Sequence, residues 1–144
     1  MLVHQILGSK ASEVVLTISP AASLADAAQM LSERRIGSLV VSTDGTQAEG
    51  ILSERDLVRE IGRRGGSCLT DRVSDVMTRD VKTCTRGQTA DDVLQMMTDG
   101  RFRHMPVVEG GVLVGLISIG DVVKARLAEL AMEKDALEGM IRGF

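Results

Sequence analysis

Apolar positions along the chain repeat at the spacings of strands and helices. The clearest pattern is a pair of Val- and Ile-rich runs, 105–108 and 112–119, separated by Gly110-Gly111. Two such runs around a glycine pair predict two paired strands. From Asp121 the apolar residues follow helical spacing as far as Ile141, which predicts a long helix directly after the second strand.

The first half of the chain repeats this pattern with different residues. Residues 23–30 (SLADAAQM) resemble residues 89–96 (TADDVLQM), at an offset of 66. Residues 50–58 (GILSERDLV) resemble residues 115–123 (GLISIGDVV), at an offset of 65. The first hairpin turn is therefore one residue longer than the second. Polar Ser and Asp recur in register with the apolar residues, which indicates a duplicated unit.

Each unit is predicted to have the order β-α-β-β-α. In the first unit the pattern predicts, in turn, a strand over 14–18, a helix capped by Ser23, a strand over 39–42, a turn at Asp44-Gly45, a return strand over 50–53 and a helix over 56–62. The second unit follows the same course, with its first helix over 89–99. A short leader over 2–7 precedes the first unit, and residues 73–77 resemble it.

The predicted boundaries are 1–62 for the first unit with its leader, 63–72 for a linker, 73–126 for the second unit and 127–144 for a C-terminal helix. The linker is predicted at the surface because its sequence is Gly-rich and polar. The last helix carries an apolar stripe, which fits packing on the domain or on a partner subunit. Its residues are Leu127, Leu130, Ala131, Leu137 and Met140. Units this small are expected to share one core.

Composition narrows the range of functions. The chain has 144 residues, a net charge of −3 and only two aromatic side chains. Nucleic-acid binders typically have a basic excess and stacking aromatics, so nucleic acid is not an expected partner. No apolar run approaches the ~20 residues that span a bilayer, and no signal peptide is recognised, so we expect a cytoplasmic protein without a membrane partner. Cys68 and Cys84 form neither a disulfide framework nor a metal motif, and no metal is predicted.

With these motifs in place, the chain resembles a tandem pair of cystathionine-β-synthase (CBS) domains, an arrangement called a Bateman module. The resemblance is carried by GILSERD at 50–56, GLISIGD at 115–121, RFRHMPVVEGG at 101–111 and the two leaders. It implies an α/β (α+β) fold in which two repeats are related by a pseudo-twofold axis, with their sheets facing each other. It also implies two clefts between the repeats and the pairing of modules into homodimers.

The ligands implied by the resemblance contain adenosine: AMP, ADP, ATP, NAD or S-adenosylmethionine. The implied role is a regulatory module that senses energy or redox state for a protein effector that the sequence does not identify. Each cleft is implied to be shared between the repeats. Ser118 and Asp121 would face Lys10–Val15 and Ile36-Gly37-Ser38, whereas Ser53 and Asp56 would face Arg79–Val81 and Phe102-Arg103-His104.

The residue types at these positions suit such a ligand chemically. One carboxylate accepts both hydroxyls of a ribose, which is the role expected of Asp56 and Asp121. Ser53 and Ser118 stand at predicted helix N-termini, where a hydroxyl and backbone N–H groups favour a phosphate. Guanidinium groups pair well with phosphate. The candidate charge partners are Arg34, Arg35, Arg55, Arg101 and Arg103.

The two clefts are predicted to differ in charge. Residues 35–41 read RIGSLVV, whereas residues 101–107 read RFRHMPV. Arg103 and His104 should therefore add positive charge to the cleft of Ser53 and Asp56, which is expected to prefer more highly phosphorylated ligands.

Other interpretations remain open from the sequence. Ser53 and Ser118, each with its Asp, would also serve as helix caps alone. An enzyme acting on a nucleotide is a second function class, although no nucleophile with a base is found. A structural dimerisation module with vestigial clefts is a third. His4 is interpreted as structural or exposed. Cys68 and Cys84 are interpreted as having no special role, with oxidation of Cys68 in the predicted linker as the alternative.

Overall fold

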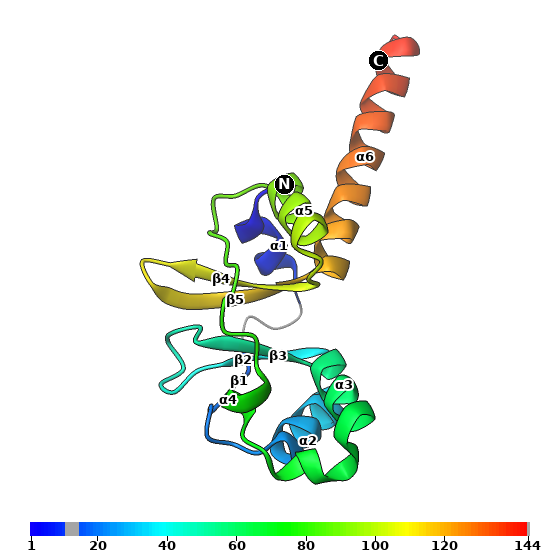
Figure 1. Ribbon diagram of the computed structural model, residues 1–144. Helices are drawn as coiled ribbons and strands as arrows, with labels where there is room; N and C mark the ends of the chain where they lie inside the picture. Colours follow the sequence, from blue (N-terminus) through cyan, green and yellow to red (C-terminus); the bar gives the residue numbers. More distant parts are fainter. Residues whose placement is uncertain (11–14, 144) are drawn as a thin grey trace.

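Two similar halves of the protein stack with their sheets between them and their helices outside (Figure 1). The structure is a computed structural model that describes residues 1–10 and 15–143. Its elements are α1 (Val3–Ser9), β1 (Thr17–Ile18), α2 (Leu24–Arg34), β2 (Ser38–Val41), β3 (Gly50–Ser53), α3 (Glu54–Arg64), the 3-10 helix η1 (Gly65–Thr70), α4 (Val73–Val76), α5 (Ala90–Gly100), β4 (His104–Glu109), β5 (Val112–Ser118) and α6 (Ile119–Ile141). The predicted α/β fold of two related units with a C-terminal helix is confirmed.

The two sheets differ by one strand. In the first sheet β1 runs parallel to β2, and β2 runs antiparallel to β3. In the second sheet β4 and β5 are antiparallel. Gly110 and Gly111 both adopt positive φ in the turn between them, as a two-residue hairpin turn of this kind requires. The counterpart of β1 is a single parallel bridge between Cys84 and Val107, so the first strand of the second unit is reduced to one contact.

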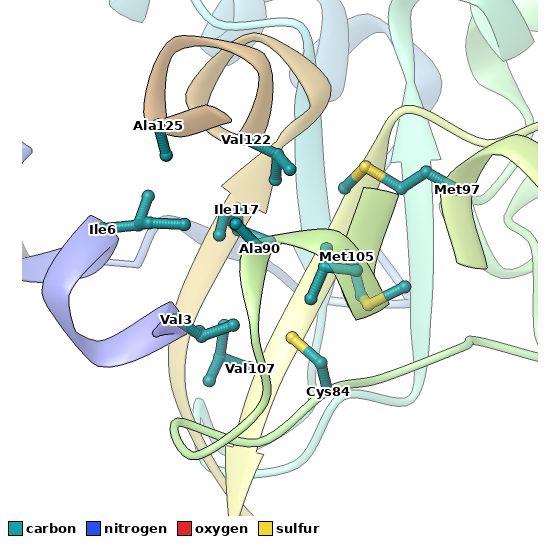
Figure 2. Packing of buried hydrophobic residues seen from close by; sticks show 11 residues of the cluster. Val3, Ile6, Cys84, Ala90, Met97, Met105, Val107, Ile117, Val122 and Ala125 are labelled. Carbon is teal, nitrogen blue, oxygen red and sulfur yellow. The ribbon is translucent and has the colours of Figure 1, made fainter. Parts of the chain in front are cut away.

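The two short leader helices are exchanged between the halves. Val3 and Ile6 of α1, which precedes the first unit, are buried in the core of the second unit (Figure 2). Val73 of α4, which precedes the second unit, is buried in the core of the first unit. A Cβ placed on Gly115 of β5 would lie 2.8 Å from Leu7 of the leader, so glycine permits this close approach. Each half needs a segment from the other half to complete its core.

Two hydrophobic cores take the place of the predicted shared core. The core of the first unit contains Ile18, Leu24, Ala27, Leu31, Leu39, Val41, Leu52, Leu57, Cys68 and Val73. The core of the second unit contains Val3, Ile6, Cys84, Ala90, Val93, Met97, Met105, Val107, Ile117, Val122 and Ala125 (Figure 2). The facing sides of the sheets are left to line the clefts, and the exchanged leaders connect the two cores.

The segment 63–72 lies mostly at the surface, as its composition predicts, but it is helical rather than irregular. Arg63 and Arg64 continue α3, and η1 follows directly. The Cys68 side chain is fully buried in the core of the first unit, so the alternative of an oxidisable thiol in an exposed linker is wrong. Burial in the second core likewise raises the pKa of the Cys84 thiol to about 12, which keeps that thiol protonated and unreactive.

Two arginines end helices in a conformation that glycine usually adopts. Arg35 after α2 and Arg101 after α5 are left-handed, with φ of 52° and 56°. They occupy equivalent positions in the two units, and the N–H of each closes the last turn of its helix. This conformation costs an L-residue roughly 1–2 kcal/mol. The sequence does not predict it, because neither position is a glycine.

Helix α6 begins at the second sheet and extends away from the body (Figure 1). Val122 and Ala125 near its start are buried, and Arg126 pairs with Asp91 of α5 at 2.7 Å. The apolar side chains from Leu127 onward are exposed. Within the described ranges, no helix combines the length and the apolar character that crossing a membrane demands.

Candidate functional site

Equivalent capping boxes begin α3 and α6. The backbone N–H of Ser53 donates to Asp56 Oδ2 at 2.9 Å, and the N–H of Asp56 donates to Ser53 Oγ at 3.3 Å. At α6 the corresponding bonds between Ser118 and Asp121 measure 2.9 and 3.1 Å. The predicted capping role is therefore present at both helices. It fixes each carboxylate at a helix N-terminus, where the positive end of the helix dipole favours anions.

The first cleft, which we call the Asp121 cleft, has a volume of about 800 Å³ and lies between the halves. It is lined by His4, Leu7, Gly8, Lys10, Val15, Leu16, Arg34, Ile36, Gly37, Ser38, Arg86, Val114, Gly115, Leu116, His104, Ser118 and Asp121. Lys10 Nζ lies 3.0 Å from Asp121 Oδ2 and donates to the Leu116 carbonyl at 2.9 Å. A cation thus already stands beside the carboxylate, near the N-terminus of α6.

The second cleft, the Asp56 cleft, has a volume of about 590 Å³. It is lined by Gly37, Ser38, Ile51, Ser53, Glu54, Arg55, Asp56, Arg59, Thr78, Asp80, Val81, Lys82, Gly100, Arg101, Phe102, Arg103, His104, Ser118 and Ile119. Asp56 Oδ1 accepts a hydrogen bond from Arg59 at 3.3 Å. Among the described residues, five Lys and Arg side chains line the Asp56 cleft and three line the Asp121 cleft. Glu54 and Asp80 also line the Asp56 cleft and add two carboxylates to that of Asp56.

The two clefts share a wall at the centre of the protein. Gly37, Ser38, His104 and Ser118 line both clefts. His104 Cε1 lies 3.4 Å from where a Cβ on Gly37 would stand, so the imidazole of β4 covers the glycine that directly precedes β2. Ser38 is 3% exposed, and among the described residues its Oγ has no hydrogen-bond partner.

Burial and charge set the protonation states near this wall. Burial lowers the pKa of His104, and Lys10 and Arg103 lower it further, against the opposing effect of the Asp121 and Glu54 carboxylates. The imidazole is therefore uncharged at neutral pH. His104 therefore adds positive charge to the Asp56 cleft only at pH values low enough to protonate the imidazole.

The Asp121 carboxyl is held in its charged form. Burial alone would raise its pKa, but the Ser118 N–H and the Lys10 ammonium outweigh that effect and lower the pKa. A carboxylate that stays ionised is a good acceptor for ligand hydroxyls.

The structure brings together most of the predicted site residues. Lys10, Val15 and 36–38 line the same cleft as Ser118 and Asp121, and Val81 and 101–104 line the same cleft as Ser53 and Asp56. Part of the predicted Lys10–Val15 segment, residues 11–14, lies outside the described residues. Two arginines are placed elsewhere: Arg35 lines neither cleft, and Arg79 donates to the Ser74 carbonyl at 2.7 Å.

Several lining residues were missed by sequence reasoning. Arg59 follows the Asp56 cap by one helical turn, so helical spacing alone would have found it. Lys82 and Arg86 flank the reduced strand at Cys84 and carry no motif that marks them. His4 is exposed, as interpreted, but it lies at the Asp121 cleft because its leader packs on the second unit. In the part of the chain that the structure describes, no group of three His, Cys, Asp or Glu side chains is arranged to hold a metal ion.

Comparison with known proteins identifies both halves. The family model described as CBS domain matches residues 7–63 and again residues 73–128. The "CBS domain-containing protein CBSX3, mitochondrial" of Arabidopsis thaliana is 38% identical over 122 residues, which cover 82% of this chain and 59% of that protein. The chain therefore spans little more than half the length of this relative.

Solved structures share the fold. The CBS-domain containing protein ATU1752 from Agrobacterium tumefaciens superposes with a TM-score of 0.82 and 44% identity, covering 88% of this chain and 99% of that one. The CBS domain pair of protein MJ0100, in complex with 5'-methylthioadenosine and S-adenosyl-L-methionine, gives a TM-score of 0.77 over 90% of this chain and 98% of that one. Its identity of 23% shows a common fold and no more.

Proposed function

The chain belongs to the CBS domain family as a pair of repeats, and from this premise we propose that it is a regulatory module binding adenosine-containing nucleotides in its two clefts. AMP, ADP, ATP and NAD are the ligands proposed. The observation that carries the proposal is the duplicated site. Each cleft has a Ser-x-x-Asp cap at a helix N-terminus, with basic side chains nearby.

The proposed ligand position follows from the chemistry of each wall. The ribose hydroxyls donate to the Asp56 or Asp121 carboxylate, and the phosphates lie toward the helix N-terminus and the basic side chains. Adenine packs against apolar side chains such as Ile51 and Val81 in one cleft and Val15 and Leu116 in the other. Volumes of about 590 and 800 Å³ fall in the range of small-molecule sites.

The complex of MJ0100 supports an adenosine-containing ligand only through the fold that the two proteins share. That protein holds adenosine compounds, 5'-methylthioadenosine and S-adenosyl-L-methionine. This demonstrates that a CBS domain pair can accept an adenosine group. The choice between AMP, ADP, ATP and NAD in this chain depends on the basic side chains that face the phosphates.

A regulatory role fits the position of the sites. Asp121 stands in the first turn of α6, whose other end leaves the body (Figure 1). A ligand held by Asp121 therefore acts at the base of the element that is best exposed to other molecules. We propose that ligand occupancy alters a protein effector or the assembly of the module into a homodimer.

The test begins with the small molecules that the purified protein retains. Mass spectrometry of the compounds released on denaturation should detect an adenine nucleotide. Millimolar AMP, ADP, ATP, NAD or NADH should raise the melting temperature by mass action. An unchanged melting temperature with all five would contradict the proposal. Product analysis after incubation separates a sensor, which returns the nucleotide intact, from an enzyme that converts it.

A further inference from the structure

Helix α6 carries exposed apolar residues at the spacing of a coiled coil. Val123, Leu127, Leu130, Leu137 and Ile141 are 41%, 62%, 49%, 60% and 85% exposed. Their separations alternate between four and three residues, with Lys134 filling the remaining position. At 3.6 residues per turn the six positions lie within an arc of roughly 80° on one side of the helix. This is the narrow stripe of a heptad repeat.

The stripe is separate from the face that packs on the body. That face carries Val122 and Ala125, which are buried, and its centre lies roughly 130° around the helix from the middle of the stripe. The extension is also absent from the first unit, where α3 ends at Arg64, the equivalent of Glu129. The family match ends at residue 128. The extension is therefore a feature of this chain rather than of the repeat.

We propose that this stripe pairs with α6 of a second copy of the chain in an antiparallel coiled coil. We call it the α6 seam: Val123, Leu127, Leu130, Lys134, Leu137 and Ile141. The proposal rests on the seam alone and does not depend on nucleotide binding. It follows from the spacing of the seam and from the charges that flank it.

The flanking charges select the antiparallel direction. In a parallel pair Lys134 would meet Lys134 of the second copy inside the seam, and Glu133 would face Glu138 on both sides. In an antiparallel pair Lys134 packs beside Leu130 of the second copy, and Lys124 faces Glu138 at both ends of the seam. The remaining like-charge contact is Glu133 with its own copy. Attraction at both ends, with no buried pair of lysines, favours this register.

The antiparallel arrangement also suits the shape of the protein. The seam is 19 residues long, which corresponds to roughly 28 Å. The two bodies then lie at opposite ends of the helix pair, and the tip of each α6 reaches Val123 of the other copy. Val123 is two residues from Asp121, so the seam runs up to the edge of the Asp121 cleft.

The test is the mass of the full-length protein in solution, measured by sedimentation equilibrium. At concentrations on the order of 100 µM the parent protein should be a dimer that dissociates on dilution, because a seam of fewer than three heptads is short. Leu130→Asp with Leu137→Asp should give a monomer whose melting temperature equals that of the parent protein at dilutions where the parent dimer has dissociated. Met132→Asp is the matched control, since Met132 is 69% exposed on the opposite side of α6, and it should remain a dimer.

The outcomes are distinguishable. A parent protein that stays monomeric overturns the proposal, and so does a dimer that persists in the Leu130→Asp, Leu137→Asp protein. Direction is tested by charge exchange. Lys124→Glu should weaken the dimer roughly fivefold to tenfold, and adding Glu138→Lys should restore it. These residues are about 21 Å apart along a parallel pair, so a lack of restoration overturns the antiparallel assignment.

Discussion

Replacing Arg101 by glycine should have two opposite effects: it relieves backbone strain, which stabilises the fold, and it removes a side chain that is proposed to bind phosphate in the Asp56 cleft. Arg101 has a φ of 56° and lines the Asp56 cleft, whereas Arg35 has a φ of 52° and lines neither cleft. In the folded state, glycine removes a conformational cost of roughly 1 kcal/mol. In the unfolded chain, the extra freedom of glycine offsets about 0.5 kcal/mol of that gain. Arg101→Gly and Arg35→Gly should each raise the free energy of unfolding by about 0.5 kcal/mol.

Their effects on nucleotide binding should differ. A hydrogen bond between Arg101 and a phosphate would contribute roughly 1.5–3 kcal/mol, so Arg101→Gly should weaken binding in the Asp56 cleft about tenfold to a hundredfold. Arg35→Gly should leave affinity unchanged. Urea unfolding and calorimetric titration of ATP measure the two quantities. A loss of stability in both variants would refute the strain argument, and equal affinities would refute the role of Arg101.

Three further predictions concern the body of the protein. Gly50→Ala should lower the free energy of unfolding by about 1–3 kcal/mol, because the new Cβ would lie 2.5 Å from Met77 Sδ and 3.0 Å from the Thr78 carbonyl oxygen. This loss should exceed that of Gly115→Ala. Equal losses of the two variants in urea unfolding would contradict this. Burial lowers the pKa of His104 in the folded state, so stability should fall as pH drops below about 6.5. His104→Gln should flatten that part of the urea-midpoint profile, and an unchanged profile would contradict it. The exchanged leaders should give one calorimetric unfolding transition, and two separate transitions would show that the halves are independent.

The sequence predicts the features that depend on local periodicity. The β4–β5 hairpin follows from two apolar runs around Gly110-Gly111, and the caps at Ser53 and Ser118 follow from Ser-x-x-Asp before a helical pattern. The duplication at offsets of 65 and 66 then predicts that both units share one architecture. Resemblance to a known family, rather than periodicity, supplies the expectation that each cleft draws residues from both units.

The features that the sequence does not predict depend on contacts between distant segments. No local sequence pattern indicates that α1 packs on the second unit, so the sequence does not predict that His4 lies at the Asp121 cleft. The sequence does not predict the contact of His104 with Gly37 for the same reason, because the two residues belong to different units. Arg35 and Arg101 take a glycine conformation because the chain must turn there to enter β2 and β4, whatever residue is present.

Calorimetric titration of ATP into the parent protein, Asp56→Asn and Asp121→Asn tests the central claim most directly. Asparagine keeps an oxygen for the Ser N–H of each cap but removes the carboxylate that would accept both ribose hydroxyls. The parent protein should bind ATP, and each variant should weaken a different binding event about tenfold or more, leaving the other unchanged. Binding by both variants that matches the parent protein would contradict the assignment of the two clefts as nucleotide sites.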